Sequence, residues 1–322
     1  MWKYVVKRLL LMIPVILGVS VLIFTIMYFV PGDPARISLG SNATEEQVAA
    51  KRIELGLDQS YVVQLGIFLK EVFLDFNLGK SYFGNSLVMN EIIARFPRTL
   101  TLAFFSMVLS VLVGVPLGIT SAIHRNTWKD SAAMMVSFIG VSMPPFWFGM
   151  VLVIVFSLGL GLLPASGIES VSSYILPVIA CSLGGIATLA RQTRSSMLEV
   201  IRADYIVTAR AKGIAEKKVI RHHALRNALI PVITAAGTQF GILMGGALIV
   251  ETVFTIPGIG LYMMKGLNSR DYPVVRGCVI FTAIVFGLIM LGVDLIYAFA
   301  DPRIKGQYSG DKKKRRKVGN ES

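Results

Sequence analysis

Residues 9–30 read LLLMIPVILGVSVLIFTIMYFV, a run of 22 residues that carries no charged side chain. A helix needs about 20 mostly apolar residues to cross the hydrocarbon core of a bilayer, so this run predicts a membrane span. Lipid cannot hydrogen-bond a loose backbone, and no ten-residue alternating pattern suggests a barrel, so helix is the expected conformation. Comparable stretches follow at 99–123, 131–159, 175–190, 231–250 and 277–300. The sequence therefore predicts an all-α polytopic membrane protein with about six transmembrane helices.

The composition of the whole chain supports this class. Of the 322 residues, 54% are hydrophobic and 16% are charged, and the mean hydropathy is +0.66, outside the balance of ordinary soluble domains. The sequence PGDP at 31–34 follows the first run where a signal peptide would need small residues for cleavage, so this helix is expected to be retained. Cys181 and Cys278 both fall in predicted spans, which gives neither a disulfide framework nor a metal-ligand spacing. We expect them to be packing residues.

The distribution of Lys and Arg predicts the orientation of the chain. With the N-terminus inside, the cytoplasmic segments hold 22 of the 32 basic residues and the outer segments hold 10, so the positive-inside rule places both termini in the cytoplasm. The expected organisation is an N-terminal end with the first span at 1–30, an extracytoplasmic loop with short amphipathic helices at 31–98, a membrane core at 99–300 with a cytoplasmic loop at 191–230, and a basic cytoplasmic tail at 301–322. The tail is expected to meet anionic lipid headgroups rather than nucleic acid.

The third predicted span is interrupted near its middle. Pro144 and Pro145 remove two backbone donors from the helical hydrogen-bond ladder. Such a break is tolerated where it faces protein or a wet cavity, and transporters often place their pathway there, although a kink needed only for packing is the alternative. In other spans, glycines four residues apart, at 237, 241 and 245 and at 114 and 118, would let a neighbouring backbone approach closely. The candidate pathway residues are Ser142, Pro144, Pro145, Trp147, Gly241 and Gly245.

Two acidic residues lie near predicted spans, Glu251 at the outer end of the fifth and Asp294 toward the inner end of the sixth. An acid inside the membrane is a candidate proton relay. Both residues lie close enough to an interface to reach water, and no second buried ionisable group accompanies them. We therefore expect structural roles for both.

The 191–230 segment is the most informative part of the sequence. Its nine Lys and Arg residues would each cost about 2.5 to 3.5 kcal/mol at the bilayer centre, so the segment must stay outside the hydrocarbon. Residues 204–212 can form a short helix that stops at Gly213. Apolar residues at helical spacing within 216–230, opposed by basic ones, predict a second helix. A helix-turn-helix held between two spans is what a rigid docking element requires.

The sequence DYIVTARAKG at 204–213, followed by HALRNALIP at 223–231, resembles the coupling loop of binding-protein-dependent ABC importer permeases of the dipeptide, oligopeptide and nickel branch. The resemblance extends through nearly the whole chain. The general permease signature is Glu-Ala-Ala, three residues, Gly, then nine residues before Ile-x-Leu-Pro, and this chain departs from it. Val207, Thr208 and Ala209 stand in the Glu-Ala-Ala places, and Pro231 lies 18 positions beyond Gly213. No salt bridge to an ATPase is therefore assigned, and the longer spacing resembles the peptide branch.

The resemblance implies a type I ABC importer permease-like fold in a subunit that is not itself an enzyme. The chain lacks the G-x-x-x-x-G-K-[ST] motif that cradles nucleotide phosphates, so ATP and Mg would be used by partner subunits, and no cofactor is expected here. The implied partners are a second homologous permease subunit, two ATP-binding-cassette ATPase subunits, an extracytoplasmic solute-binding protein and the lipid of a bacterial or archaeal cytoplasmic membrane. The coupling residues carried over are Asp204, Thr208, Ala209, Ala211 and Gly213.

The expected function is to form half of a translocation pathway for small peptides delivered by an external binding protein. Import of nickel or another small solute by the same machinery is the alternative within the family. From a different class, a stand-alone secondary transporter or channel would need buried charged relays at the midplane. A membrane-embedded enzyme would need paired polar residues within the spans. Neither of these leaves a role for the 191–230 segment.

Overall fold

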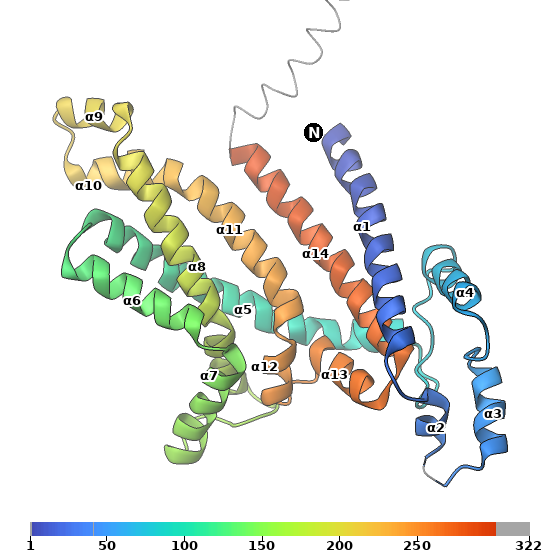
Figure 1. Ribbon diagram of the computed structural model, residues 1–322. Helices are drawn as coiled ribbons and strands as arrows, with labels where there is room; N and C mark the ends of the chain where they lie inside the picture. The colour runs from blue at the N-terminus through green and yellow to red at the C-terminus, as the bar shows by residue number, and fades with distance from the viewer. Residues whose placement is uncertain (1, 41, 301–322) are drawn as a thin grey trace, which may run out of the picture. The chain divides into compact units, whose positions relative to one another are not determined.

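The computed structural model describes residues 2–40 and 42–300, so the predicted basic tail at 301–322 lies outside the described residues. The described chain is helical, as expected, with an isolated antiparallel bridge between Lys80 and Leu87 (Figure 1). Its first half contains α1 (Trp2–Phe29), α2 (Pro34–Leu39), α3 (Glu45–Glu54), α4 (Tyr61–Phe73), α5 (Val88–Ile123), α6 (Trp128–Ser142), α7 (Pro145–Leu152) and the π-helix η1 (Val153–Gly159). Its second half contains the 3-10 helix η2 (Val171–Tyr174), α8 (Ile175–Ile201), α9 (Asp204–Ala211), α10 (Glu216–Lys218), the π-helix η3 (Val219–Ala224), α11 (Leu225–Gly246), α12 (Leu248–Val253), α13 (Ile259–Ser269) and α14 (Tyr272–Ala300).

The membrane spans agree with the sequence in number. Among the described residues, five helical segments are long and apolar enough to cross a membrane: Val5–Phe29, Val88–Ile123, Val171–Ile201, Glu216–Gly245 and Tyr272–Ile296. A sixth span is present if the bent pair Trp128–Ser142 and Pro145–Gly159 counts as one crossing. Several helices run further than the apolar runs that predicted them, because polar side chains can continue a helix beyond the lipid. At the start of α5, Glu91 and Arg95 form an ion pair one turn apart.

The break expected in the third span is present. Helix α6 ends at Ser142, Met143 is extended with φ −90° and ψ 121°, and α7 begins at Pro145. The two helices are bent by 99°, far more than a proline kink within a continuous helix. Pro145 stands at the first helical position, where a backbone N–H has no helical partner in any case. A new helix can therefore start at this proline, although the previous one could not pass through it.

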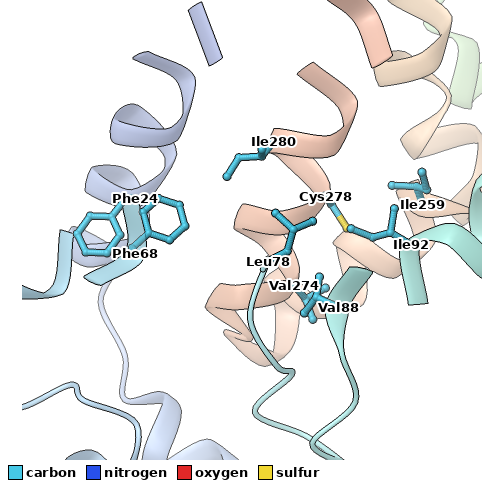
Figure 2. Close-up of a cluster of buried hydrophobic side chains, with 9 residues drawn as sticks. All are labelled: Phe24, Phe68, Leu78, Val88, Ile92, Ile259, Val274, Cys278 and Ile280. Atoms are coloured by element: carbon cyan, nitrogen blue, oxygen red, sulfur yellow. The ribbon is translucent and has the colours of Figure 1, made fainter. Parts of the chain in front are cut away.

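The chain divides into two compact units, which we describe separately. The first comprises Met1–Phe104, Phe146–Ala180 and Leu243–Gly287, and the second Phe105–Pro145, Cys181–Ile242 and Leu288–Ser322. In the first unit, a buried apolar cluster brings together Phe24, Phe68, Leu78, Val88, Ile92, Ile259, Val274, Cys278 and Ile280 (Figure 2). The rings of Phe24 on α1 and Phe68 on α4 stack with centroids 5.2 Å apart. Cys278 is a buried free thiol in this cluster, which is the packing role expected for it.

Glu251 caps a helix inside the first unit. Its fully buried carboxylate accepts hydrogen bonds from the backbone N–H groups of Gly260 (2.7 Å) and Leu261 (3.2 Å) and from the Thr99 hydroxyl (2.6 Å). The two N–H groups belong to the first turn of α13, where they lack helical partners and where the helix dipole favours a negative charge. Glu251 therefore has the structural role expected from the sequence. The expectation that it reaches water is wrong, because α12 and α13 fold back on each other around it.

Two glycines of α5 let α8 approach closely in the second unit. A methyl group built at Gly114 would lie 2.7 Å from the carbonyl oxygen of Ile186, and one at Gly118 would lie 2.6 Å from the Cβ atom of Thr193. These distances are shorter than any real contact, so only glycine fits at either position. The predicted close approach at these two glycines is confirmed, and its partner is α8, the helix that leads into the 191–230 segment.

Candidate functional site

The 191–230 segment is a helical hairpin at the end of α8 (Figure 1). Helix α8 continues to Ile201, and α9 follows after a break of two residues. The second predicted helix is present as α10, the π-helix η3 and the start of α11, which run on from one another and contain Pro231 inside α11. Figure 1 shows α9 and α10 lying beside each other beyond the end of α8. The expected helix-turn-helix is therefore confirmed.

Helix α9 has well-defined ends. It begins at Asp204, an acid in the first turn that the helix dipole favours. It ends in a Schellman motif, in which the Gly213 N–H donates to the Arg210 carbonyl (2.9 Å) and the Ile214 N–H to the Ala209 carbonyl (3.4 Å). Gly213 has φ +74°, a left-handed conformation that costs glycine little and a β-branched residue much more. The predicted stop at Gly213 is thus present.

The inner face of α9 packs on the chain itself. Ile206 is fully buried and Ala209 is 7% exposed. Both belong to an apolar cluster in the second unit, which we call the hairpin core and which consists of Ala122, Met197, Ile206, Ala209, Val219, Ala224 and Ala228. Ala209 is small because α9 must lie close to η3. Ala209 thus packs within this chain, although the sequence predicts a contact with a partner at this position.

The outer face of α9 is exposed. The exposed residues include three of the predicted coupling positions, Asp204, Thr208 and Ala211. Val207, exposed by 57%, lies among them, and sequence reasoning passed over it as a coupling residue although it stands in a Glu-Ala-Ala place. The signal was available, because an apolar residue outside the helical period of Ile206 and Ala209 has to face away from the hairpin core.

Polar contacts fasten α9 at both ends. The Arg210 guanidinium donates two hydrogen bonds to the Glu216 carboxylate, at 2.7 and 3.1 Å, which joins the end of α9 to α10. The Asn227 amide donates to the Tyr205 hydroxyl at 3.0 Å, which joins the start of α9 to α11. Both pairs are exposed and so contribute modestly to stability. Their effect is to fix the direction of α9 relative to the two helices that follow it.

A buried ion pair lies further along the second unit. Asp130, 5% exposed, accepts two hydrogen bonds from the Arg194 guanidinium, both of 2.8 Å. Its carboxylate also accepts from the Ser121 hydroxyl (2.5 Å) and the Asn126 N–H (3.1 Å), so each of its oxygens has two partners. The pair ties the turn between α5 and α6 to α8. Sequence reasoning missed it, although Asp130 is the one acid in the 124–130 turn.

The candidate pathway residues differ in their surroundings. Ser142 and Pro145 lie in the second unit and Trp147 in the first, and all are exposed, as is Pro144. Gly241 is buried in the second unit. Gly245 is exposed in the first, where a methyl built on it would lie 3.7 Å from the Thr282 side chain, an ordinary contact. At Gly237, which belongs to the same row of glycines, an added methyl would collide with Val293 of α14.

Family models match this sequence along most of its length. The model described as binding-protein-dependent transport system inner membrane component matches residues 114–306, and the model of the N-terminal part of such membrane components matches residues 1–103. The chain belongs to this family of ABC importer permeases. The expectation drawn from the 204–231 sequence is therefore confirmed. The permease is a non-catalytic, multi-pass subunit of the inner membrane.

Named relatives of the permease match 95% of its length. The dipeptide transport system permease protein DppB of Alkalihalophilus pseudofirmus is 41% identical over 95% of this chain and 100% of its own. The glutathione transport system permease protein GsiC of Salmonella typhimurium is 43% identical over 95% and 99%. A putative peptide transport system permease protein of Brucella abortus is 41% identical over 95% and 99%. Among solved structures, a chain of the MetNI methionine ABC transporter matches the fold with a TM-score of 0.57, at 20% identity, over 66% of this permease and 97% of that chain.

Proposed function

We propose that this permease forms half of the translocation pathway of an ATP-driven importer of small peptides, and that α9 is the contact through which partner ATPases drive it. The observation that carries the coupling role is the construction of α9. It presents an open outer face on a helix that is buried on its inner face and bonded at both ends. The 41% identity, over 95% of this chain, to a permease named for dipeptides supports the class of cargo.

Packing contacts connect α9 directly to the membrane spans. Ile206 and Ala209 press on Met197 of α8 and on Val219 and Ala224 of η3, all in one close-packed cluster. Close-packed side chains transmit displacement because they have no room to yield. Helix α8 is in turn locked to α5 at Gly114 and Gly118 and to the start of α6 by the Asp130 and Arg194 pair. Displacement of α9 would therefore move these spans as a body, as alternating access requires.

The outer face of α9 supplies the contact itself. Val207, Thr208 and Ala211 offer a surface with short side chains and no net charge, which suits a shallow cleft in a partner. Asp204 adds a charge at the N-terminal end, and Gly213 sets where the helix stops. In this proposal Ala209 acts from the inner face, by letting α9 lie close to η3.

The partners follow from this division of labour. Two ATPase subunits would consume ATP and Mg, a second homologous permease would complete the pathway, and an extracytoplasmic binding protein would deliver the cargo in a bacterial or archaeal cell. Both termini of the permease would lie in the cytoplasm with 31–98 outside. The pathway would use the break at Met143 and Pro144, because an interrupted helix exposes backbone groups that a polar cargo can contact.

A substitution on the outer face of α9 tests the coupling role. Val207→Asp adds a charge to the contact and leaves the hairpin core unchanged, so the permease should insert normally while losing ATPase binding. The measurement is copurification of the ATPase subunits and peptide-stimulated ATP hydrolysis in reconstituted vesicles. Lys217→Asp, exposed on the neighbouring α10, is the matched control. Normal coupling by Val207→Asp would show that α9 is not the contact.

The name of one relative favours a particular peptide. The 43% identity to a permease named for glutathione makes this tripeptide a second candidate cargo. Dipeptides and glutathione share amide groups and free carboxylates, so one pathway could pass either. Competition between labelled dipeptide and unlabelled glutathione for uptake by the assembled importer separates them. Nickel uptake unaffected by either peptide would reject the peptide assignment while leaving the coupling role intact.

A further inference from the structure

A polar cavity lies in the first unit, where α1 ends and α14 begins. Its volume is about 330 Å³, near the lower limit of small-molecule sites. The residues that line it come from α1, the turn before α2, α2, α3, the segment before α4, α4 and α14, and include Tyr28, Asp33, Arg52, Leu57, Tyr272 and Arg276. Neither the coupling role nor the broken span uses this cavity.

The charged residues that line the cavity are Asp33, Arg52 and Arg276. Arg52 donates two hydrogen bonds to one carboxylate oxygen of Asp33, at 2.7 and 3.1 Å, so these two residues neutralise each other. Burial raises the pKa of Asp33, but the bond and charge of Arg52 outweigh this and hold the pKa below its usual value. Within the described residues, no carboxylate lies within salt-bridge distance of Arg276. Glu71 and Asp271 act on Arg276 electrostatically from further away, so Arg276 is the charged residue of the cavity lining without a salt-bridge partner.

Arg276 is held in place by neutral groups. Its guanidinium lies 4.9 Å from the ring centroid of Phe68 and 5.2 Å from that of Phe24, and its Nε donates to the Tyr272 carbonyl at 3.2 Å. The Tyr82 side chain is a further neighbour. A guanidinium has five N–H donors in a planar fork, which matches the two oxygens of a carboxylate or phosphate. The Arg276 guanidinium is therefore held in one orientation, and some of its N–H groups remain able to donate to a bound anion.

An apolar groove lies beside the cavity on the same helix. It has a volume of about 540 Å³ and is lined by Leu17, Gly18, Val21, Leu22, Thr25 and Ile26. The Thr25 hydroxyl donates to the Val21 carbonyl (2.6 Å) and bonds the Tyr61 hydroxyl (2.8 Å), so the groove has no unsatisfied polar group at that residue. Tyr28, Tyr61 and Tyr272 gather near the junction, as aromatic residues do at the headgroup level of membranes.

We propose that the cavity binds the phosphate of an anionic phospholipid, with Arg276 as the anion ligand and an acyl chain along the groove on α1. A polar site lined by two arginines and one carboxylate, next to an apolar groove on α1, has the shape and chemistry of such a lipid. A soluble carboxylate would fit the arginine but has no use for the groove.

Native mass spectrometry of the purified importer complex tests the proposal. After delipidation, the complex is titrated with phosphatidylglycerol and, in parallel, with phosphatidylcholine. One phosphatidylglycerol should bind more tightly than the others, and Arg276→Gln should weaken it by about ten- to hundredfold, the usual loss for a hydrogen bond to a charged group. Leu57→Trp, which fills the cavity without changing any charge, should have the same effect and remains informative if Arg276→Gln does not fold.

The control is Arg36→Gln, which removes an exposed arginine of α2 that pairs with Glu45 outside the cavity. It should leave lipid binding unchanged. Equal binding by all variants would overturn the proposal. Displacement of the bound lipid by millimolar dialanine or inorganic phosphate would also overturn it, because the natural occupant would then be a soluble anion.

Discussion

The attachment of α9 depends on Ile206 more than on its polar contacts. Replacing a fully buried isoleucine by alanine costs about 2 to 5 kcal/mol, because apolar burial is lost and a cavity remains. The Arg210 and Glu216 side chains are 38% and 55% exposed, and such an ion pair contributes about 0.2 to 1 kcal/mol. The Tyr205 to Asn227 hydrogen bond adds about 1 kcal/mol. The apolar anchor thus outweighs either polar contact.

Hydrogen exchange of the α9 amides measures which of these contacts holds the helix most strongly. In the assembled importer without nucleotide, Ile206→Ala should speed exchange of the α9 amides by about 30-fold or more, the factor that 2 kcal/mol of lost local stability gives. Arg210→Gln should speed it by no more than about fivefold, as 1 kcal/mol allows. Lys217→Ala, exposed on α10 and outside the proposed contact, should leave exchange unchanged. If Arg210→Gln loosened α9 as much as Ile206→Ala, the hairpin core would not be what holds the helix.

Three further substitutions test other parts of the structure. Gly118→Val should lower the yield of folded permease through a clash with α8 that costs about 1 to 3 kcal/mol, whereas Gly18→Ala, where an added methyl meets nothing within 4 Å, should not. Glu251→Gln should lower the melting temperature at a cost of about 1 to 3 kcal/mol, because the amide loses the negative charge at the start of α13 and puts an NH2 group where an oxygen accepts from the Thr99 hydroxyl, while the exposed Glu54→Gln should have little effect. Replacing Pro144 and Pro145 together by alanine should let α6 continue and so change peptide uptake; unchanged uptake and ATP hydrolysis would leave the break a packing feature.

Periodicity and composition predicted the elements that depend on local sequence. The spans follow from uninterrupted apolar runs, and the end of α9 follows from a glycine placed where the chain needs a positive φ. The break after Ser142 was also visible, because two prolines leave no alternative to an interrupted helix. The sharpness of the bend could not be predicted from the sequence, because it depends on where the following helix packs.

Contacts between residues far apart in the chain could not be predicted from the sequence. Glu251 and Thr99 meet across 152 positions to cap α13, and Asp130 and Arg194 meet across 64. Glu251 looked like an interfacial residue and Asp130 was not singled out, because neither pattern nor charge indicates which partner the fold will supply. Ala209 was misjudged for a related reason. Its small side chain fits an interface with another protein and an interface with η3 equally well, and only the packing separates them.

Cross-linking tests the coupling role of α9 most directly. A cysteine placed at Thr208 on the exposed face of α9, in the otherwise intact importer, is treated in membranes with a short cross-linker that joins a thiol to a lysine amine, with Glu45→Cys in the 31–98 segment as the control. Thr208→Cys should form a covalent adduct with an ATPase subunit, and Glu45→Cys should not. ATPase subunits that copurify with the Thr208→Cys permease but never cross-link to it would contradict the assignment of α9 as the site where ATP hydrolysis is coupled to transport.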